Sequence, residues 1–572
     1  MGDVFRQLAE KADLQAKERR ERMLAEALAS IENVRDPNAF VAAARCCKQL
    51  GQLHETLRIL EQGIRRCVPS PLLYEYYVER LEKCNRTEEA IAVAHEAARL
   101  FPSDLIFQLR EALLLPVFYD SREQVNYYRR RFTDGLRRIV SLVPLDTAVE
   151  QRRALEAIGK NSNKYLPYQG ENDRELQGLY GGWVHAIMAA NYPQWVHPVA
   201  MPSVDRKIRV GYLSSQSDRF LNTSAAKLFG AWLREQNRER YEVFAYHADR
   251  RADPTAEVVR RWNLSFRQLT GEVSEIAQAI LRDRLHALIY LDFGLHPRMA
   301  QLASLRLAPV QCVAWDTPLT SGIPTMDYFL SSELMEPEDG QSHYREKLIR
   351  LPGVGASFAK PVIPTPILMK TRRDFGLREG AVVYLSSQSI FKFLPEQDQL
   401  VARIAHRVPA SQFVFLVNND LVGNDFRMRM DRAFAALGLR AGDHCVWLAE
   451  MNIFDYWNLH KVADVFLDTL GWSAGVASFE AIACGLPVVT LPGTLMRSRH
   501  SLGILTLLGV TETIARDPAA YVKVAVSLGV DRQSRRSVID RMVAGYSALY
   551  SDSRSVRSLE NFFRSAVTER LP

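Results

Sequence analysis

The chain has 572 residues, of which 47% are hydrophobic and 24% are charged, and its formal net charge at pH 7 is +7. A chain of this length predicts about three or four domains of roughly 150 residues each. The composition is typical of a folded protein and excludes long disordered regions, while a small net charge of interspersed sign argues against a nucleic-acid-binding protein.

The cysteines and the N-terminus indicate the cellular compartment in which the protein is expected. The seven cysteines are odd in number and include no C-x-x-C pair, which argues against a disulfide framework and against a structural zinc site. The chain begins Met1-Gly2-Asp3 without an apolar stretch, and no window offers the roughly 18 uncharged apolar residues of a membrane span. We therefore expect a cytoplasmic protein with reduced thiols and no membrane span.

The first part of the chain, residues 1–160, is expected to be a helical domain. It is rich in Ala, Leu and charged residues with helical periodicity, and prolines divide it into short units. Several positions correspond after 34 residues, the period of helix-turn-helix tetratricopeptide repeats. The pairs are Gly51 and Asn85, Thr56 and Ala90, Leu60 and Ala94, and Gly63 and Ala97. A degenerate repeat module and an unrelated helical bundle both fit this signal, and either offers a docking surface for a protein.

Residues 161–205 are an aromatic connecting segment. Its large rings are Tyr165, Tyr168, Tyr180, Trp183, Tyr192 and Trp195. Rings at this density predict a joint that packs the helices against the region that follows.

From Lys207 onward, short apolar runs alternate with helical stretches, which is typical of βαβ units and a parallel sheet. We predict two doubly wound, Rossmann-like α/β lobes at 206–370 and 371–535, followed by C-terminal helices at 536–572. Ligands of such sheets bind at the carboxyl ends of the strands, so the cleft between the lobes is the expected active site. The predicted strands are 208–213, 243–246, 287–291, 310–315 and 328–330 in the first lobe, and 382–385, 413–417, 445–448, 465–467 and 488–491 in the second.

Polar residues follow the first strand of the second lobe. Residues 386–392 read Ser-Ser-Gln-Ser-Ile-Phe-Lys, which places hydroxyl and amide groups and one cation at the end of that strand. Lys392 can neutralise a diphosphate leaving group at this position. The alternative is a surface lysine ahead of a helix that begins at Pro395.

A stronger signal lies at 463–489, which reads as a buried strand, a turn of small residues, a helix and another strand. The N-terminal amides of such a helix can hold phosphate. Glu480 lies about one turn into the helix, where its carboxylate can accept hydrogen bonds from ribose hydroxyls; a solvated helix glutamate is the alternative. The segment 491–500 repeats the strand, glycine turn and helix start and adds Arg497 and Arg499.

With these segments the region from Lys207 to Leu559 resembles the O-linked N-acetylglucosamine transferases and their bacterial relatives, including the adhesin N-glucosyltransferases. The resemblance implies a two-lobed GT-B fold, inverting sugar transfer without a metal ion or other cofactor, and a UDP-sugar donor bound mainly by the second lobe. Besides the two second-lobe segments, it rests on residues 208–215 (Ile-Arg-Val-Gly-Tyr-Leu-Ser-Ser), 305–311 (Leu-Arg-Leu-Ala-Pro-Val-Gln), Thr320-Ser321-Gly322, Met326-Asp327-Tyr328 and, upstream, 168–173.

The resemblance also implies roles for individual residues of the second lobe. Lys392 matches the lysine that contacts the diphosphate, and Gln388 the polar residue before it. Glu480 stands at the place of the ribose-binding carboxylate, and Tyr456 where a ring packs near the uracil. The backbone that reads the base is expected at Glu450 and Met451, and the phosphate turn, less polar than the family's, at Gly475, Val476, Ala477 and Ser478.

The first lobe departs further from the family. Residues 221–225 (Leu-Asn-Thr-Ser-Ala) lack the expected histidine, and 316–318 (Asp-Thr-Pro) replace a Gly-His-Pro motif of bacterial relatives. His296 is the first candidate for a general base, with Asp316 as a further possibility, although His296 can also serve as a helix cap. His286 lies at the opposite end of its strand and is expected to be structural.

The expected function is transfer of a hexose or N-acetylhexosamine to a Ser, Thr or Asn side chain of a polypeptide that the helical domain recruits. One alternative keeps the chemistry but uses a small molecule or glycan as acceptor. Another is an inactive transferase-like scaffold, which the apolar phosphate turn and the absent first-lobe histidine favour and which Lys392 and Glu480 argue against.

Overall fold

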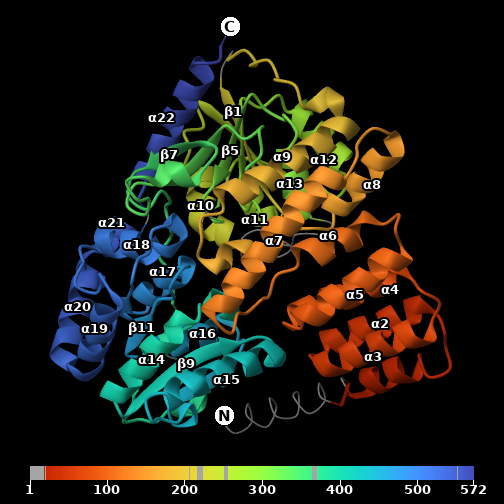
Figure 1. Ribbon diagram of the computed structural model, residues 1–572. Helices are drawn as coiled ribbons and strands as arrows, with labels where there is room; N and C mark the ends of the chain where they lie inside the picture. The colour runs from red at the N-terminus through yellow and green to blue at the C-terminus, as the bar shows by residue number, and fades with distance from the viewer. Residues whose placement is uncertain are drawn as a thin grey trace. The chain divides into compact units, whose positions relative to one another are not determined.

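The computed structural model describes residues 18–19, 21–204, 207–215, 223–249, 256–317, 319–363, 370–550 and 552–571. The chain divides into two compact units, Met1–Val117 and Phe118–Pro572 (Figure 1). The helical domain expected over 1–160 is thus shared between the two units, because the helices after Val117 pack with the second one.

The first unit is built of helix pairs. Helices α2 and α4 begin at Pro37 and Pro71, and α3 and α5 begin at Leu53 and Thr87, so the pair recurs after the predicted 34 residues. The turns inside the two pairs are equivalent, since Gly51 and Asn85 both adopt positive φ. The helices are α2 (Pro37–Gln49), α3 (Leu53–Arg66), α4 (Pro71–Lys83), α5 (Thr87–Leu100) and α6 (Leu105–Leu113).

Small residues let these helices approach closely. A β-carbon on Gly63 of α3 would lie 2.9 Å from the ring of Phe40 in α2. The matching position in α5 is Ala97, which is fully buried against Tyr74 and Phe107. Hydrophobic contact at small side chains therefore holds each pair together.

The second unit begins with helices outside its sheets. These are α7 (Arg122–Leu142), α8 (Ala148–Ile158) and α9 (Arg174–Asn191), joined by a 3-10 turn at Leu166–Gln169. Helix α9 contacts α7, α8 and a helix of the first lobe, α13 (Pro297–Ala303). The aromatic segment thus packs against the lobes as predicted.

The first lobe contains a seven-stranded parallel sheet in the order β3-β2-β1-β4-β5-β6-β7. Its strands are β1 (Ile208–Ser214), β2 (Tyr241–His247), β3 (Ser265–Gln268), β4 (Ala287–Tyr290), β5 (Val310–Ala314), β6 (Tyr328–Ser332) and β7 (Lys347–Leu351). Besides α13, its helices are α10 (Ser224–Arg234), α11 (Ala256–Arg260) and α12 (Val273–Arg282).

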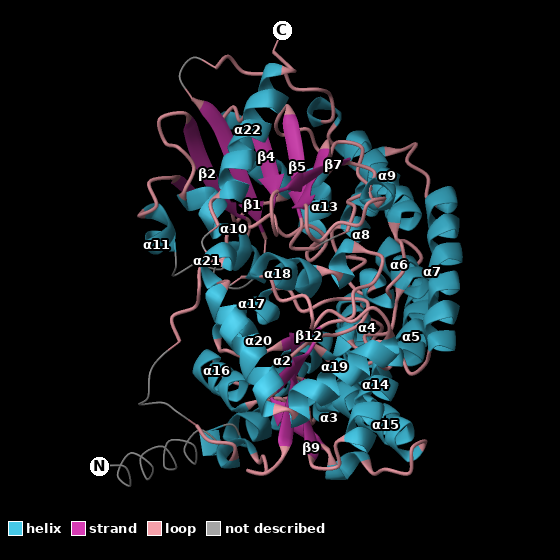
Figure 2. Ribbon diagram, turned by 90° about the vertical axis from the view of Figure 1, so that its left-hand side faces the viewer, coloured by secondary structure: helices cyan, strands magenta, loops and turns pink. Residues whose placement is uncertain are grey.

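The second lobe has a five-stranded parallel sheet in the order β10-β9-β8-β11-β12. Figure 2 shows the two sheets as separate layers flanked by helices. The strands are β8 (Val382–Ser386), β9 (Ser411–Val417), β10 (Cys445–Ala449), β11 (Val465–Leu467) and β12 (Val488–Val489). The helices are α14 (Glu396–Arg407), α15 (Asp420–Ala435), α16 (Ile453–Val462), α17 (Val476–Ala483), α18 (His500–Leu508), α19 (Pro518–Val530), α20 (Arg532–Ala544) and α21 (Tyr546–Leu549).

The last helix, α22 (Arg554–Thr568), returns to the first lobe. Its Glu560 accepts hydrogen bonds from the backbone N–H of Asn237 at 2.7 Å and from the hydroxyl of Tyr241 at 2.6 Å. The C-terminal end of the chain therefore ties the two lobes into one unit.

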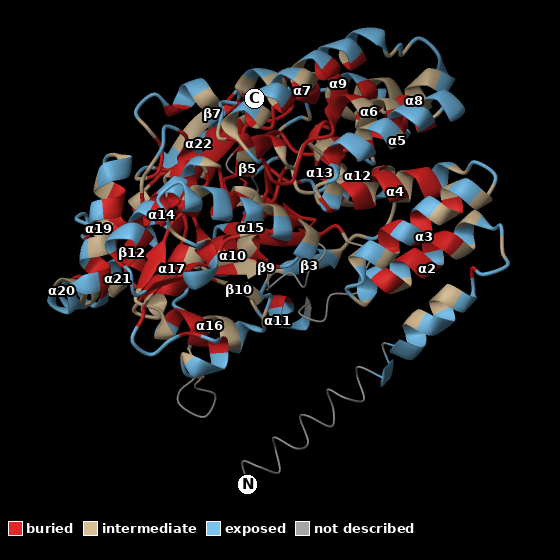
Figure 3. Cartoon of the chain, turned by 60° about the horizontal axis from the view of Figure 1, so that its bottom comes forward, coloured by how far each residue is buried: buried red, intermediate tan, exposed pale blue. Residues whose placement is uncertain are grey.

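All ten predicted strands are present, whereas β3 and β7 were not predicted. Both are edge strands whose side chains are largely exposed or half-buried, so they lack the continuous apolar run of a central parallel strand. Figure 3 shows the contrast, with the inner strands buried beneath helices whose outer faces are exposed. All seven cysteines are free, and the described helices include none that is long and apolar enough to cross a membrane.

Candidate active site

Lys392 and Gln388 lie together at the carboxyl end of β8. A 3-10 turn at Ile390–Lys392 brings the lysine back over the strand end, where its Nζ donates to Oε1 of Gln388 at 2.9 Å. The ring of Trp472 lies 5.8 Å from Nζ. The structure thus brings these two predicted site residues together, and their roles toward a diphosphate stay predictions.

The charge of Lys392 is sensitive to its surroundings. Burial lowers the pKa of Lys392 to about 8, while the nearby carboxylates of Asp468 and Asp316 act to raise it. Asp468 follows β11 in the second lobe, and Asp316 follows β5 in the first. Lys392 therefore lies where the carboxyl ends of both sheets meet, the location expected for ligands of this fold.

A buried carboxylate shapes the turn after β11. Asp468 accepts hydrogen bonds from the hydroxyls of Ser473 and Thr490 and from the N–H of Ala474, each at 2.7 Å. The turn ends at Gly475, the N-cap residue of α17, at φ 55° and ψ −117°. Among the described residues, the N–H groups of Gly475 and Val476 have no acceptor. These two amides point out of the helix N-terminus, where an anion is stabilised.

The other two residues of the predicted phosphate turn are directed inward. The N–H groups of Ala477 and Ser478 donate to the carbonyls of Ala474 and Gly475. The hydroxyl of Ser478 is fully buried and lies 2.8 Å from that of Ser501. Phosphate binding by this turn therefore depends on the backbone of Gly475 and Val476.

Replacing Gly475 by alanine is expected to lower the free energy of unfolding by about 1–3 kcal/mol, because its dihedral angles suit glycine alone. The added β-carbon would also lie 3.3 Å from Nδ1 of His500. Urea unfolding of the variant measures this loss. The matched control is Gly182→Ala in α9, where the new methyl group meets open space and no loss of stability is expected. Equal unfolding curves for the two variants would contradict the account of the turn.

Glu480 and Tyr456 lie together beside β8. The hydroxyl of Tyr456 is 3.1 Å from that of Ser387. Burial raises the pKa of Tyr456, and the neighbouring Glu480 carboxylate raises it further. Glu480 is itself buried and accepts a hydrogen bond from Lys227 of α10 at 2.8 Å. Glu480 is thus not the solvated helix glutamate that was its alternative.

The two residues expected to read the base follow β10. Glu450 is exposed and Met451 is half-buried, and both precede the helix α16 that carries Tyr456. Their backbone belongs to the loop that joins β10 to α16, and its role in reading the base stays a prediction.

The first-lobe candidates for a base differ in their contacts. Nδ1 of His296 accepts the N–H of Arg298 at 3.1 Å, which caps α13 and leaves the proton of the neutral ring on Nε2. Asp316 accepts a hydrogen bond from the hydroxyl of Ser224 at 2.9 Å. His286 is buried and accepts the N–H of Arg209 at 2.9 Å, a structural contact of the kind expected for it.

His296 nevertheless borders a hollow that reaches the second lobe. The hollow lies between the connecting segment, the loops after β4 and β5, and Trp472. Tyr168 and Trp472, whose ring centroids are 4.4 Å apart, both line this hollow. Of the first-lobe motifs, Leu221, Asn222 and Pro318 lie outside the described residues, while Thr223 caps α10.

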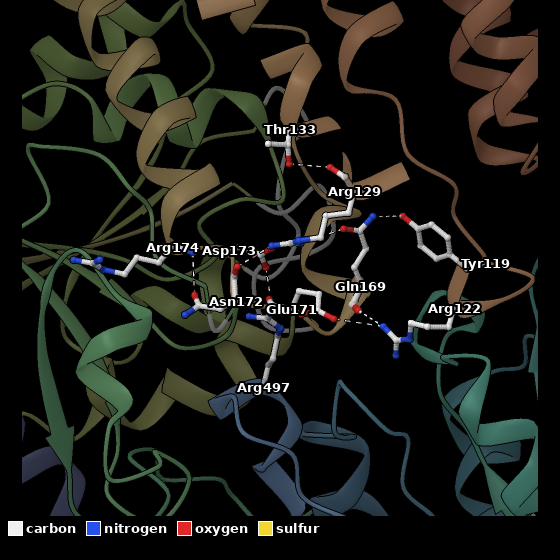
Figure 4. Close-up of polar contacts among 10 residues, drawn as sticks. All are labelled: Tyr119, Arg122, Arg129, Thr133, Gln169, Glu171, Asn172, Asp173, Arg174 and Arg497. Atoms are coloured by element: carbon white, nitrogen blue, oxygen red, sulfur yellow. Dashed lines mark hydrogen bonds and ion pairs between the residues drawn. The ribbon is translucent and has the colours of Figure 1, made fainter. Parts of the chain in front are cut away.

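Arg497 and Arg499, the two arginines of the segment 491–500, are both engaged in contacts within the protein. Figure 4 shows Asp173 between Arg129 and Arg497, with Nη atoms at 2.8 Å and 2.9 Å from its two carboxylate oxygens. Asp173 and Arg497 are both buried. Arg499 is also engaged, since its Nε donates to the carbonyl of Met335 at 2.9 Å. Arg497 is thus bound to Asp173, while Arg499 is bound to the loop after β6.

The buried pair connects the turn to the helices ahead of the lobes. The carbonyl of Arg497 accepts the N–H of Ser473 at 2.7 Å, while Arg129 belongs to α7. Asp173 belongs to the segment 168–173 that resembles the family, and no local pattern in the sequence indicates its contact with Arg497. Within the described parts of the chain, no group of three His, Cys, Asp or Glu residues could hold a metal ion.

Two doubly wound lobes with parallel sheets define a GT-B fold, and an all-α unit of helix pairs precedes them in the sequence. The chain belongs to Glycosyl transferase family 41, whose model matches residues 136–358 and 354–552.

Two curated relatives are plant proteins. The chain is 26% identical over 363 residues to the Arabidopsis thaliana protein named "Probable UDP-N-acetylglucosamine--peptide N-acetylglucosaminyltransferase SPINDLY", covering 61% of this chain and 38% of that protein. The rice (Oryza sativa subsp. japonica) protein of the same name is 24% identical over 424 residues, 71% of this chain and 44% of its own length. The match thus spans less than half the length of these relatives.

Among solved structures, a mutant O-GlcNAc transferase of Thermobaculum terrenum aligns with a TM-score of 0.67. It is 21% identical, and the alignment covers 93% of this chain and 98% of that one. This likeness supports the order of a helical region followed by two lobes.

Proposed function

We propose that the protein transfers a hexose or N-acetylhexosamine from a UDP-sugar to a protein side chain, with inversion at the anomeric carbon and without a metal ion. The observation that carries this proposal is the grouping of Lys392, Gln388 and the open amides of Gly475 and Val476 at one sheet edge. Family membership and the names of the plant relatives support it.

In this mechanism the acceptor attacks the anomeric carbon while the bond from that carbon to the diphosphate oxygen breaks. The electron pair of the broken bond passes to the diphosphate, whose growing charge Lys392 and the two amides of α17 stabilise. Such fixed positive groups can supply the charge stabilisation that a metal ion gives in other transferases. Glu480 would hold the ribose, and Tyr456 and the backbone of Glu450 and Met451 the base.

The proton of the acceptor needs a base on the first-lobe side, and we propose Asp316 ahead of His296. Asp316 lies near Lys392, and its carboxylate can accept a proton directly. His296 would first have to give up the N-cap hydrogen bond from Arg298 or change its tautomer. The acceptor side chain would reach the donor through the hollow beside Trp472.

The polypeptide acceptor is proposed from the first unit, whose 34-residue helix pairs are of a kind that binds proteins. We also propose a cytoplasmic location, which the seven free cysteines support. The experiment that identifies the acceptor also determines whether the sugar is linked to Ser, Thr or Asn.

The test is sugar transfer measured by mass spectrometry. The purified protein is incubated in EDTA with UDP-glucose or UDP-N-acetylglucosamine and a library of Ser-, Thr- and Asn-containing peptides. A hexose or N-acetylhexosamine mass on a peptide, absent with Lys392→Ala, is the expected result. UDP release without a peptide adduct would favour a small-molecule acceptor. If neither UDP nor a peptide adduct forms, the result would favour the scaffold alternative, which is also favoured by the burial of the Ser478 hydroxyl away from the phosphate turn.

A further inference from the structure

A side chain of the first lobe reaches into the candidate donor site of the second. Lys227 lies in the first turn of α10, and its Nζ is 2.8 Å from Oε1 of Glu480 in α17. The carboxylate is almost completely buried, with 6% of its side chain exposed, whereas 33% of the Lys227 side chain remains exposed. The two residues border a hollow between the lobes that also contains Ile453 and Trp457.

The charge at Glu480 poses an electrostatic problem for the proposed donor. The open amides of Gly475 and Val476 lie five and four positions before Glu480, which is an axial rise of roughly 6–8 Å along α17. A diphosphate on those amides would therefore stand close to a buried carboxylate, and like charges at such distances repel strongly in a site with little water. In the described structure, the ammonium group of Lys227 is the cation on Glu480.

We propose that Lys227 is a donor-binding residue contributed by the first lobe, which neutralises Glu480 and attracts the diphosphate of the nucleotide. The inference rests on the proposed function, because it takes the UDP of a sugar donor as the ligand. Since the cation belongs to one lobe and the carboxylate to the other, the donor's charge is balanced only when the two lobes are together. Lys227 thereby couples lobe closure to occupation of the donor site.

A purely structural ion pair makes different predictions from a donor-binding lysine. If Lys227 only clasped the lobes together, its loss would weaken the binding of uridine and of UDP alike. If it only blocked Glu480, its loss would strengthen both. If Lys227 attracts the diphosphate, its loss weakens the binding of UDP and leaves the binding of uridine, which carries no phosphate, nearly unchanged.

The experiment is calorimetric titration of the full-length protein with UDP and with uridine. Lys227→Met is expected to weaken UDP binding by about tenfold, the size typical of one charge-assisted contact, and to change uridine binding by less than about twofold. Lys227→Arg retains the charge and is expected to bind UDP within about threefold of wild type. The matched control is Arg260→Met in α11 of the same lobe, whose side chain pairs with Glu257 and is 56% exposed; its UDP affinity is expected to equal that of wild type.

A double-mutant cycle identifies the partner of Lys227. In a Glu480→Gln background the carboxylate is gone, so Lys227→Met is expected to weaken UDP binding by clearly less than it does in wild type. Three results would each overturn the inference. Lys227→Met could weaken the binding of UDP and uridine equally, or it could leave UDP binding unchanged or tighter. It could also weaken UDP binding by the full factor of ten in the Glu480→Gln background. A wild-type protein that binds neither ligand would overturn the proposed function together with it, whereas wild-type binding with an unaffected Lys227→Met overturns the inference alone.

Discussion

Replacing Lys392 by alanine is expected to lower kcat/KM for UDP release from a UDP-sugar by a factor of about 10² to 10³, as for loss of one preorganised group that stabilises transition-state charge. Lys392 is the cation held against Gln388 at the strand end, and its charge would meet the departing diphosphate. The measurement is initial-rate kinetics in EDTA. An unchanged rate would remove Lys392 from the mechanism.

The same residue predicts a pH dependence. The pKa of Lys392 is lowered to about 8, so its ammonium form predominates below that pH and is lost as the pH rises through it. The part of kcat/KM that depends on this charge should therefore fall above about pH 8. Lys392→Arg stays charged throughout the accessible range, and its profile should lack this alkaline fall.

Replacing Asp173 by asparagine is expected to lower the unfolding free energy by about 3–5 kcal/mol, the cost of leaving a buried ion pair without one partner. Asp173 is the anion between Arg129 and Arg497, and Arg497 is almost completely buried. Since the carbonyl of Arg497 holds the N–H of Ser473, weaker UDP binding should accompany the loss. Urea unfolding and UDP titration measure the two effects.

Glu171 supplies the control for that variant. It lies two residues earlier, its side chain is 48% exposed, and its carboxylate is 3.6 Å from Arg122. Glu171→Gln is expected to change stability by about 0–1 kcal/mol, as for other exposed ion pairs. A loss as large as that of Asp173→Asn would show that any change in this loop destabilises the protein, and would contradict a specific role for the buried pair.

The sequence predicted those elements whose burial leaves a local pattern. Central parallel strands such as β1, β8 and β11 are buried on both faces and therefore appear as apolar runs. The edge strands β3 and β7 lack such runs. The unit boundary after Val117 was not predicted, because α7 has the same amphipathic character whichever core it packs against.

The candidate site was predictable where its residues are close in sequence. Gln388 and Lys392 are four positions apart and face each other through one turn. The contacts between Lys227 and Glu480 and between Asp173 and Arg497 span 253 and 324 positions. The local sequence around each residue does not indicate its distant partner, so these ion pairs could be identified only from the folded structure. Similarly, the sequence did not distinguish the open amide of Val476 from the inward hydroxyl of Ser478.

The most direct test of the central claim is calorimetric titration of the wild-type protein with UDP in EDTA, alongside Lys392→Ala. A donor site built from Lys392 and the amides of α17 predicts saturable binding of one UDP per chain without metal, and at least tenfold weaker binding by the variant. No binding at millimolar UDP, or equal binding by the two proteins, would contradict the assignment of this cleft as a nucleotide-sugar site.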